Sequence, residues 1–480
     1  MTEDVRSLVI RSSAVNFVAS FLLKGLVLVQ TVAYARIFSP TELGQVSTVI
    51  LVVSFATLFS RMGFDESIVR ENRDPETVMN TALTISLVMG LSLFALLNLG
   101  APFVARVFHR AELEAYTRLL SFFVFATPLG LPNALWVRRF RFDREKAASY
   151  SDLLVATGVT LGLHFGTSLG IWSLFVGRLA GFAANYATVW LLAAYRPRFA
   201  FDRSQAKALY RFGWPVVVIG LANYLMLQGD DVLVRYFWGD ASLAYYLLAY
   251  SFPYYLREAT DVLLGALLPS FSRLRDSKER LTSAFVESNK YITHAIAPIG
   301  FFLAAAARPI VLVVFGEKWA PAIEPMSLLA LGFTIQVMWG YGWGMLCLAW
   351  GKTRYLMYVK LWIVFYLATV GILLIRAHGP MGGATYYVTQ SILTVGVVRF
   401  WILKRELGSL AFLKDSWKPV VAGVLPGALL WLAGPSITTA PALLLAGLGY
   451  LAGYVLLTVA LDPGIVRESK QILGTLVRRA

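Results

Sequence analysis

The amino-acid sequence predicts an all-α polytopic membrane protein, and its composition, its apolar runs and its charge distribution support that prediction. The chain has 480 residues, of which 58% are hydrophobic and 15% are charged, and its mean hydropathy is +0.64. A soluble globular protein carries roughly 45–50% apolar and about 25% charged residues. The composition therefore excludes a soluble enzyme and a disordered chain. The single cysteine excludes a disulfide scaffold.

The apolar residues fall into fourteen runs, each near the length of about 20 residues that crosses a bilayer as a helix. The runs lie at about 13–34, 43–60, 80–101, 117–137, 150–166, 171–194, 213–234, 241–266, 289–315, 322–350, 355–375, 382–402, 418–434 and 441–461. The first run is too long for the core of a signal peptide, and no small-residue cleavage site follows it, so we interpret it as an uncleaved span.

The charged residues indicate the same number of spans and a topology. With the N-terminus in the cytoplasm, the inside connections hold 32 Lys and Arg residues and the outside connections hold 7. The positive-inside rule therefore favours an even number of spans with both termini cytoplasmic. The net charge of +15 then reflects cationic loops that face cytoplasm and anionic lipid, and we expect no nucleic-acid partner.

An internal repeat predicts two lobes. RIFSPTELGQV, which starts at Arg36, matches RYFWGDASLAYY, which starts at Arg235, and both stretches join the first two spans of a six-span block. Repeats that differ by an even number of spans have the same orientation in the membrane. We expect an N-lobe of six helices over 1–195, a C-lobe of six helices over 196–405, and two further helices with a basic amphipathic tail over 406–480.

Two longer stretches resemble a known family. ARIFSPTELGQVSTVILVVSFATLFSRMGFDESIVRE resembles the N-terminal signature of the Wzx-type oligosaccharide flippases, and in particular their WzxC-like branch. GDDVLVRYFWGDASLAYYLLAYSFPYYL resembles their seventh-span signature, with Asp231 at the family aspartate. PNALWVRRFRFDREKAASYSDLL and GMLCLAWGKTRYLMYVKL also fit. The resemblance covers about residues 10–405 and departs from the family at Trp238, where a leucine is usual.

The resemblance implies a fold and a function. The family belongs to the superfamily that also holds the multidrug antiporters of the MATE type and the lipid II flippase, so it implies a two-lobed, alternating-access transporter. The implied cargo is an undecaprenyl-diphosphate-linked oligosaccharide, carried from the cytoplasmic to the periplasmic leaflet of the inner membrane for surface polysaccharide synthesis. A polysaccharide polymerase and export machinery are the further partners that it implies. It implies neither an enzyme activity nor a cofactor.

Polar residues in the first span predict a cavity. A charge at mid-bilayer costs at least about 2.5 kcal/mol, so each one needs a cavity or a partner. Five polar side chains fall within an arc of about 120° on the first span. They are Asn16, Ser20, Lys24, Gln30 and Thr31. The alternative is that Lys24 pairs with a carboxylate for packing alone.

The eighth span predicts a second set of cargo contacts. Its polar side chains share one face or lie beside it: Tyr250, Tyr254, Arg257, Glu258 and Asp261. An arginine offers a bidentate fork that suits a phosphate, and tyrosine rings suit sugars. We hypothesise that Arg257 and Lys24, from opposite lobes, hold the cargo diphosphate. The alternative is a closed structural network of Arg257, Glu258 and Asp261.

Further charged residues are candidates for supporting roles. Arg178 in the sixth span is a second-rank residue for the cavity. Asp230 and Asp231, with Glu258 and Asp261, are candidates for ion coupling or gating, and the alternative is that the first two are interfacial and solvated. The basic connection 138–149 either gathers anionic headgroups or serves topology alone.

Several motifs are absent from the sequence. There is no Gly-rich phosphate loop, HExxH, CxxC or metal-ligand cluster. Three rival functions stay open at this point. They are a MATE-type cation-coupled multidrug antiporter, a membrane-embedded polysaccharide polymerase or glycosyltransferase, and a lipid II flippase.

Overall fold

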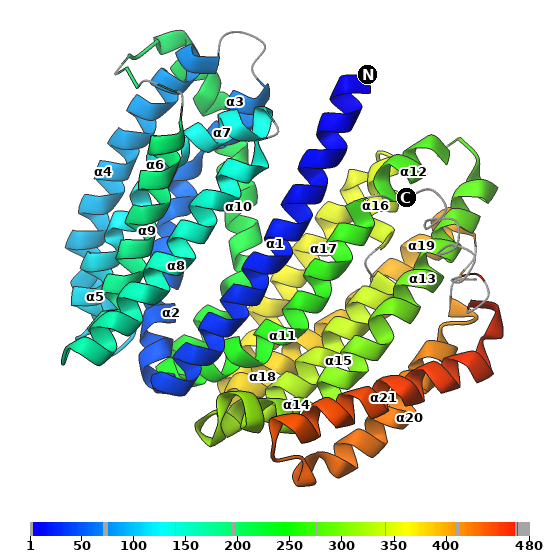
Figure 1. Ribbon diagram of the computed structural model, residues 1–480. Helices are drawn as coiled ribbons and strands as arrows, with labels where there is room; N and C mark the ends of the chain where they lie inside the picture. The colour runs from blue at the N-terminus through cyan, green and yellow to red at the C-terminus, as the bar shows by residue number, and fades with distance from the viewer. Residues whose placement is uncertain are drawn as a thin grey trace. The chain divides into compact units, whose positions relative to one another are not determined.

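The computed structural model is built from helices (Figure 1). It describes residues 3–70, 75–139, 141–193, 195, 197–198, 200–265, 267–274, 276–340, 342–408, 410, 413–465 and 468. Over these residues every regular element is helical and no strand occurs, which confirms the predicted all-α class. Most of the predicted basic tail, at 466–467 and 469–480, lies outside the described residues.

Helices long and apolar enough to cross a bilayer account for much of the described chain. Eight qualify alone, and two bent pairs qualify together, which gives up to ten. The eight are Val18–Ile37, Pro40–Val69, Val78–Val107, Arg203–Trp238, Glu317–Ala349, Thr353–Leu407, Trp417–Ser436 and Ala440–Leu461. The pairs are Leu113–Gly130 with Pro132–Arg138, and Lys278–Ala305 with Ala307–Phe315. The protein is thus a multi-pass membrane protein, and the number fourteen stays a prediction.

The chain forms two compact units, Met1–Ala241 and Ser242–Ala480. The helices of the first unit are α1 (Glu3–Ile37), α2 (Pro40–Arg61), α3 (Phe64–Arg70), α4 (Pro75–Val107), α5 (Leu113–Leu120), η1 (Ser121–Phe125), α6 (Ala126–Gly130), α7 (Pro132–Arg138), α8 (Phe142–Gly166), α9 (Trp172–Leu192) and α10 (Arg203–Trp238). These units are defined by packing and not by the repeat, so the predicted lobe boundaries at 195 and 405 stay predictions.

Within the first unit, α8 and α9 pack closely along their length, α1 packs on α8, and α2 lies against α4, α5 and α10. A buried cluster that includes Val49, Val53, Leu120 and Phe175 fills the space between α2, α5 and α9. The α2 helix begins with a capping box, in which Ser39 and Glu42 each accept a hydrogen bond from the other's backbone amide. This capping stabilises the N-terminus of α2.

The second unit is also helical. Its elements are α11 (Asp240–Gly265, whose first two residues belong to the first unit), α12 (Leu267–Leu274), α13 (Lys278–Ala305), α14 (Ala307–Ile310), η2 (Val311–Phe315), η3 (Glu317–Ala322), α15 (Ile323–Gly340), α16 (Gly342–Ala349), α17 (Thr353–Tyr366), η4 (Leu367–Gly371), α18 (Ile372–Leu393), η5 (Thr394–Arg399), α19 (Phe400–Leu407), α20 (Trp417–Ala433), η7 (Gly434–Ser436) and α21 (Ala440–Leu461). The α15 helix packs between α13 and α18, α20 packs on α13, and α21 lies beside α20 (Figure 1).

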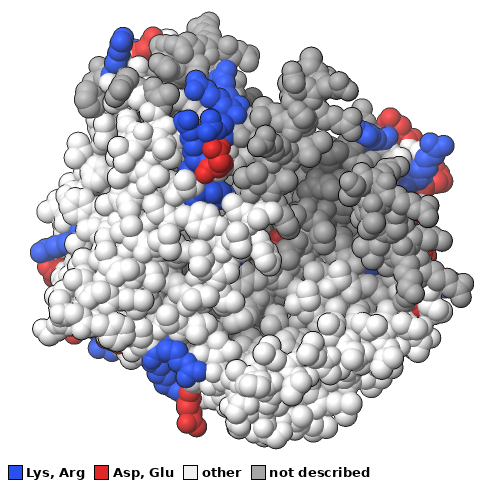
Figure 2. All heavy atoms as spheres, viewed as in Figure 1, with Lys and Arg blue, Asp and Glu red and all other residues white. Residues whose placement is uncertain are grey.

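The surfaces of the helices suit a bilayer. Figure 2 shows cationic side chains gathered near α7 and the start of α8, while uncharged atoms cover the sides of the first unit's helices. In the second unit, α20 and α21 present exposed leucines, among them Leu429, Leu432, Leu444, Leu445, Leu448 and Leu456. Apolar helix sides with charged ends are the pattern that a lipid solvent requires.

Candidate functional site

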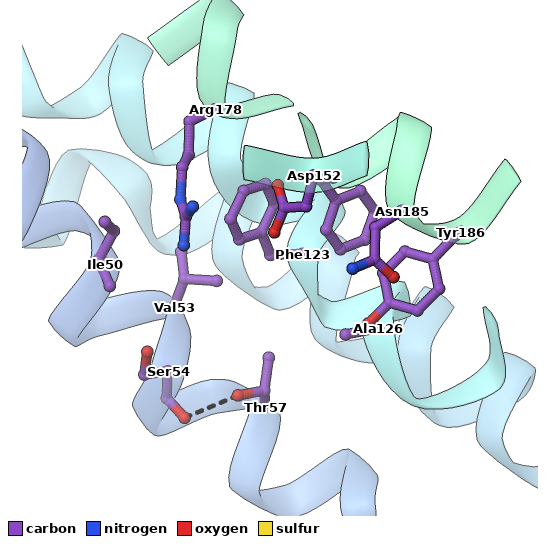
Figure 3. A pocket seen from close by; sticks show the side chains of 11 residues that line it. Ile50, Val53, Ser54, Thr57, Phe123, Ala126, Asp152, Arg178, Asn185 and Tyr186 are labelled. Carbon is purple, nitrogen blue, oxygen red and sulfur yellow. Dashed lines mark hydrogen bonds between the residues drawn. The ribbon is translucent and has the colours of Figure 1, made fainter. Parts of the chain in front are cut away.

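The first unit holds a pocket of about 250 Å³ between α2, the segment from η1 to α6, α8 and α9 (Figure 3). Its lining combines apolar, aromatic, hydroxyl and charged side chains: Ile50, Val53, Ser54, Thr57, Phe123, Ala126, Asp152, Arg178, Phe182, Asn185 and Tyr186. Two of these side chains, Asp152 on α8 and Arg178 on α9, carry opposite charges. The structure therefore places the predicted Arg178 in the wall of a cavity.

The charged groups of the pocket differ in their surroundings. Asp152 is half-buried, and its Oδ1 atom is buried without a hydrogen-bond partner among the described residues. Arg178 is exposed, and its guanidinium carbon lies 6.0 Å from the centroid of the Phe123 ring. Figure 3 shows the Arg178 side chain extending toward α2, with the Asp152 carboxylate on the same side of the pocket. The pocket thus has a carboxylate and a cationic donor in the same lining.

Aromatic rings form one wall of the pocket. Phe123 and Phe182 stack with their centroids 4.5 Å apart and an interplanar angle of 9°. Tyr186 meets Phe182 edge to face, at 4.7 Å and 62°. Offset stacks and edge-to-face pairs are favourable arrangements of aromatic rings. Because these rings hold one another in place, the wall is preorganised.

Gly181 on α9 makes room for the carboxylate. A Cβ atom at this position would lie 2.4 Å from Asp152 Oδ1 and 2.7 Å from the Asp152 carbonyl oxygen. Any larger residue would therefore push α9 away from α8 or displace the carboxylate. Small residues at an interface let two membrane helices approach closely. The glycine thus sets both the helix spacing and the position of Asp152.

The polar stripe of the first span lies partly against α8. Gln30 Nε2 donates a hydrogen bond to Thr157 Oγ1 at 2.6 Å, and Tyr34 OH donates to the carbonyl of Ala156 at 3.4 Å. Asn16 Oδ1 accepts from Ser20 Oγ at 3.4 Å within the same helix, and the Lys24 side chain is exposed. The cavity-lining role of this stripe stays a prediction.

The two aspartates of the seventh span are buried in α10. Their exposed fractions are 6% for Asp230 and 8% for Asp231. One turn or more before them, Tyr224 OH donates to the carbonyl of Leu51 at 2.9 Å, which ties α10 to α2. This burial within the first unit does not fit the alternative of aspartates that water solvates at the interface. Their role in ion coupling or gating stays a prediction.

The tyrosines of the eighth span join an aromatic cluster in the second unit. Tyr250 and Tyr254 stack at 5.7 Å, and Tyr250 also meets Phe333 and Tyr387 edge to face at 5.1 and 6.0 Å. Tyr387 OH donates to Gln336 Oε1 at 2.8 Å. The tyrosine rings are therefore braced by packing.

Two of the three charged residues of the eighth span have described side chains. Arg257 and Glu258 are half-buried on α11, and the side chain of Asp261 lies outside the described residues. Lys24 belongs to the first unit and Arg257 to the second. The hypothesis that these two cations act together on one ligand stays a prediction.

Some pocket residues were not among the sequence-predicted candidates. Asp152, Asn185 and the hydroxyls of Ser54 and Thr57 line the pocket with Arg178. The sequence holds one signal for Asp152, since it is an acid that precedes the uncharged run LLVATGVTLGL. Among the described residues, no group of three or more His, Cys, Asp or Glu side chains could hold a metal ion.

The bilayer-length helices and the charged, aromatic pocket define a polytopic membrane protein with a ligand-sized cavity inside a helical bundle. The chain belongs to a family described as "Polysaccharide biosynthesis protein", whose profile matches residues 33–324. It is 29% identical over 322 residues to the succinoglycan biosynthesis transport protein ExoT of Rhizobium meliloti (strain 1021). This match covers 64% of this chain and 62% of ExoT. It is 22% identical over 337 residues to the lipopolysaccharide biosynthesis protein WzxC of Escherichia coli (strain K12). This match covers 68% of this chain and 67% of WzxC.

Solved structures show the same fold. The lipid II flippase MurJ, in an inward closed conformation, matches with a TM-score of 0.73 at 13% identity over 94% of this chain and 100% of its own. An inward-facing multidrug resistance transporter of the MATE family matches with a TM-score of 0.60 at 14% identity. This match covers 81% of this chain and 95% of the transporter. The resemblance predicted from the sequence is thus confirmed. The matched region spans less than two thirds of the length of ExoT.

Proposed function

We propose that the protein is a flippase that carries an undecaprenyl-diphosphate-linked oligosaccharide from the cytoplasmic to the periplasmic leaflet by alternating access. The product would serve exopolysaccharide, capsule or O-antigen synthesis. The observation that carries the proposal is the combination of two likenesses in one chain. The family and ExoT are named for polysaccharide biosynthesis and its transport, and the fold over 94% of the chain is that of a lipid II flippase.

The chemistry of such a cargo accounts for the cations in the spans. A diphosphate in hydrocarbon is as costly as any buried charge, and cationic side chains offset that cost. We assign the diphosphate to Lys24 and Arg257, with Arg178 as a further cation. Tyr250 and Tyr254 would contact sugars, and Asn16 and Gln30 would be further contacts of the cargo. The polyprenyl tail would stay in the bilayer against the apolar helix sides.

Coupling and location complete the proposal. Asp230, Asp231, Glu258 and Asp261 would bind the driving ion or gate the cavity. The protein would act in the inner membrane with both termini in the cytoplasm and without enzyme activity or cofactor. A polysaccharide polymerase and export machinery would take over the flipped glycan, which is the partner class that this activity requires.

The test is an analysis of lipid intermediates in the host. After depletion of the protein, undecaprenyl-linked species are extracted, their glycans are identified by mass spectrometry, and the leaflet that holds them is determined. We expect complete repeat units to accumulate in the cytoplasmic leaflet. The double variant Lys24→Gln, Arg257→Gln should reproduce that accumulation. The matched control Arg308→Gln, which removes an exposed arginine, should not.

Two other outcomes would replace the proposal. Incomplete glycans would indicate a membrane-embedded polymerase or glycosyltransferase. Unchanged lipid intermediates with altered drug tolerance would indicate a multidrug antiporter, the candidate that the MATE-family fold also favours. An antiporter for cationic drugs would be expected to present an acidic cavity, whereas Lys24, Arg178 and Arg257 add positive charge to the spans.

A further inference from the structure

We propose that the pocket between α2, α8 and α9 is a subsite for one neutral hexose residue. This inference rests on the proposed flippase function, because it assigns part of a glycan cargo to the pocket. It concerns a single cavity within the first unit, whose lining is fully described. It differs from the diphosphate assignment, which concerns Lys24 and Arg257.

The hydrogen-bonding groups of the pocket match those of a sugar. A hydroxyl group donates one hydrogen bond and accepts others, so it is satisfied by a carboxylate on one side and a cationic or amide donor on the other. Asp152 on α8 lines the pocket and supplies a carboxylate acceptor, whose Oδ1 is buried beside Gly181 without a hydrogen-bond partner among the described residues. Arg178 and Asn185 supply donors from the neighbouring helix. A bound hydroxyl would lie between the carboxylate of Asp152 and these donors.

The charges in the lining favour a neutral ligand. Asp152 and Arg178 are the charged residues of the lining, and their charges are opposite. Their electrostatic potentials at a ligand between them therefore have opposite signs and partly cancel. A lone metal cation would be repelled by Arg178, and an acidic sugar would be repelled by Asp152. A ligand that is polar but uncharged meets neither repulsion.

The apolar wall and the volume indicate one pyranose ring. Sugars expose C–H groups on their ring faces, and the rings of Phe182 and Tyr186 offer an apolar surface to them. The pocket volume of about 250 Å³ lies below the roughly 300–1,000 Å³ typical of drug-sized ligands. It equals the liquid volume of about eight water molecules at ~30 Å³ each. That space holds one sugar residue, and the rest of a longer glycan would lie outside it.

A single-cysteine protection experiment tests the subsite in the full-length protein. Cys347 is the one cysteine of the chain, so Cys347→Ser gives a background without cysteine. Ser54→Cys then places a thiol in the pocket wall. Ser47→Cys on the same helix, two turns away and outside the lining, is the matched control. Labelling by a small maleimide is measured with and without the methyl glycosides of glucose, galactose and mannose, with methyl glucuronide as the anionic comparison.

We expect at least one neutral glycoside to slow the labelling of Ser54→Cys. At about ten times its Kd, a ligand leaves about one tenth of the sites open, so the rate should fall about tenfold. Asp152→Asn or Arg178→Gln should remove this protection. Asp143→Asn, which changes an exposed acid on the same α8 helix, should leave it intact. Labelling of Ser47→Cys should not respond to any sugar.

The proposal is overturned if no neutral glycoside protects Ser54→Cys, if only the glucuronide protects it, or if Asp152→Asn leaves protection unchanged. A Ser54→Cys thiol that never reacts would also overturn it, because the pocket would then be closed to small ligands. The lipid-intermediate test above is independent of this readout. Protection without accumulation of intermediates would reject the flippase function and retain a sugar site, whereas accumulation without protection would reject the subsite alone.

Discussion

Arg235 and Asp240 form an ion pair that is almost completely closed to solvent. Arg235 Nε lies 2.6 Å from Asp240 Oδ1, and the two side chains are 3% and 1% exposed. Thr48 on α2 joins them, since its Oγ1 accepts from Arg235 Nε at 2.8 Å and donates to Asp240 Oδ1 at 2.9 Å. Arg235 Nη2 also donates to the carbonyl of Phe108 at 3.3 Å. The turn between α10 and α11 is thereby fastened to α2 and to the end of α4.

Removing either charge of this pair should destabilise the protein strongly. Asp240→Asn leaves the Arg235 charge buried without its partner, which costs about 3–5 kcal/mol. Arg235→Gln leaves Asp240 with only the exposed Arg110, whose Nε lies 3.6 Å from Asp240 Oδ2, so its cost should lie toward the lower end of that range. The unfolding temperature of the purified protein in nanodiscs measures the loss. Glu114→Gln is the control, because it removes an exposed pair with Arg118, whose side chain is 51% exposed. That loss should be about 0.5 kcal/mol or less. Equal unfolding temperatures for Arg235→Gln and Glu114→Gln would contradict the structure.

The close approach of α2 to the backbone of Asp240 predicts that Gly44→Ala destabilises the folded protein. A Cβ atom at Gly44 would lie 1.9 Å from the carbonyl oxygen of Asp240 and 2.4 Å from its carbonyl carbon. Those atoms are backbone, so the helices must separate, and overpacking of this kind costs about 1–3 kcal/mol. At an open helical position the same change gains up to about 1 kcal/mol. Gly25→Ala, with nothing within 4 Å, is that open control. We therefore expect Gly44→Ala to lower the unfolding temperature and Gly25→Ala to raise it.

The contrast between Arg235 and the spans shows what the sequence could predict. The apolar runs were near the length that crosses a bilayer, so helices and membrane location followed from them. Arg235 was predicted in the short connection between two spans, and a charge at a helix end is usually solvated. Its burial depends on Asp240 in the same connection and also on Thr48, which lies 187 positions earlier in the chain. Hydropathy carries no information about such a partner.

The pocket shows the same limit. Arg178 was singled out because it interrupts an apolar span, but Asp152 was not. Their meeting depends on how closely α8 and α9 pack. The local signal was the pair of glycines four residues apart at Gly177 and Gly181, a spacing that permits close helix contact. A sequence pattern can suggest that contact, whereas the partner helix becomes known only from the fold.

A pH-dependent contact is predicted where the chain leaves α21. Glu468 Oε2 lies 2.8 Å from Lys290 Nζ and accepts from Tyr291 OH at 3.1 Å. The hydrogen bond from Lys290 holds the pKa of Glu468 below its usual value of 4.5. A carboxyl whose folded pKa is lowered adds stability above its unfolded pKa and loses it as the pH falls through the folded pKa. The contact should therefore weaken below pH 4.5.

Hydrogen exchange of residues 463–468 measures this contact. The Glu468 side chain is 43% exposed, so the effect should be small, about 1 kcal/mol or less and at most a few-fold in exchange rate. Glu468→Gln should exchange faster than wild type at pH 7 and lose the acid-dependent increase, after correction for intrinsic rates. Glu279→Gln, an exposed acid at the start of α13, should behave as wild type. A pH response that survives Glu468→Gln would assign the effect to another group.

The number of spans has a direct test in the stretch Thr353–Leu407. It is 55 residues long, which is more than twice the roughly 20 residues that one crossing needs. Gly379 breaks it with φ 58°, and a Cβ on Gly382 would lie 2.0 Å from the carbonyl oxygen of Leu374. Residues on the two sides of Gly379 therefore pack against each other, as they do in a helical hairpin.

Two crossings with the hairpin outside predict a particular labelling pattern. In the Cys347→Ser background, a thiol at Arg376→Cys should react with an impermeant maleimide in intact cells. Thiols at Lys352→Cys and Lys404→Cys should react only after permeabilisation, because both would face the cytoplasm, as the positive-inside rule also requires. A single crossing would instead place Lys352 and Lys404 on opposite sides of the membrane. Labelling of one of these two in intact cells would therefore reject the hairpin, and with it the fourteen-span topology.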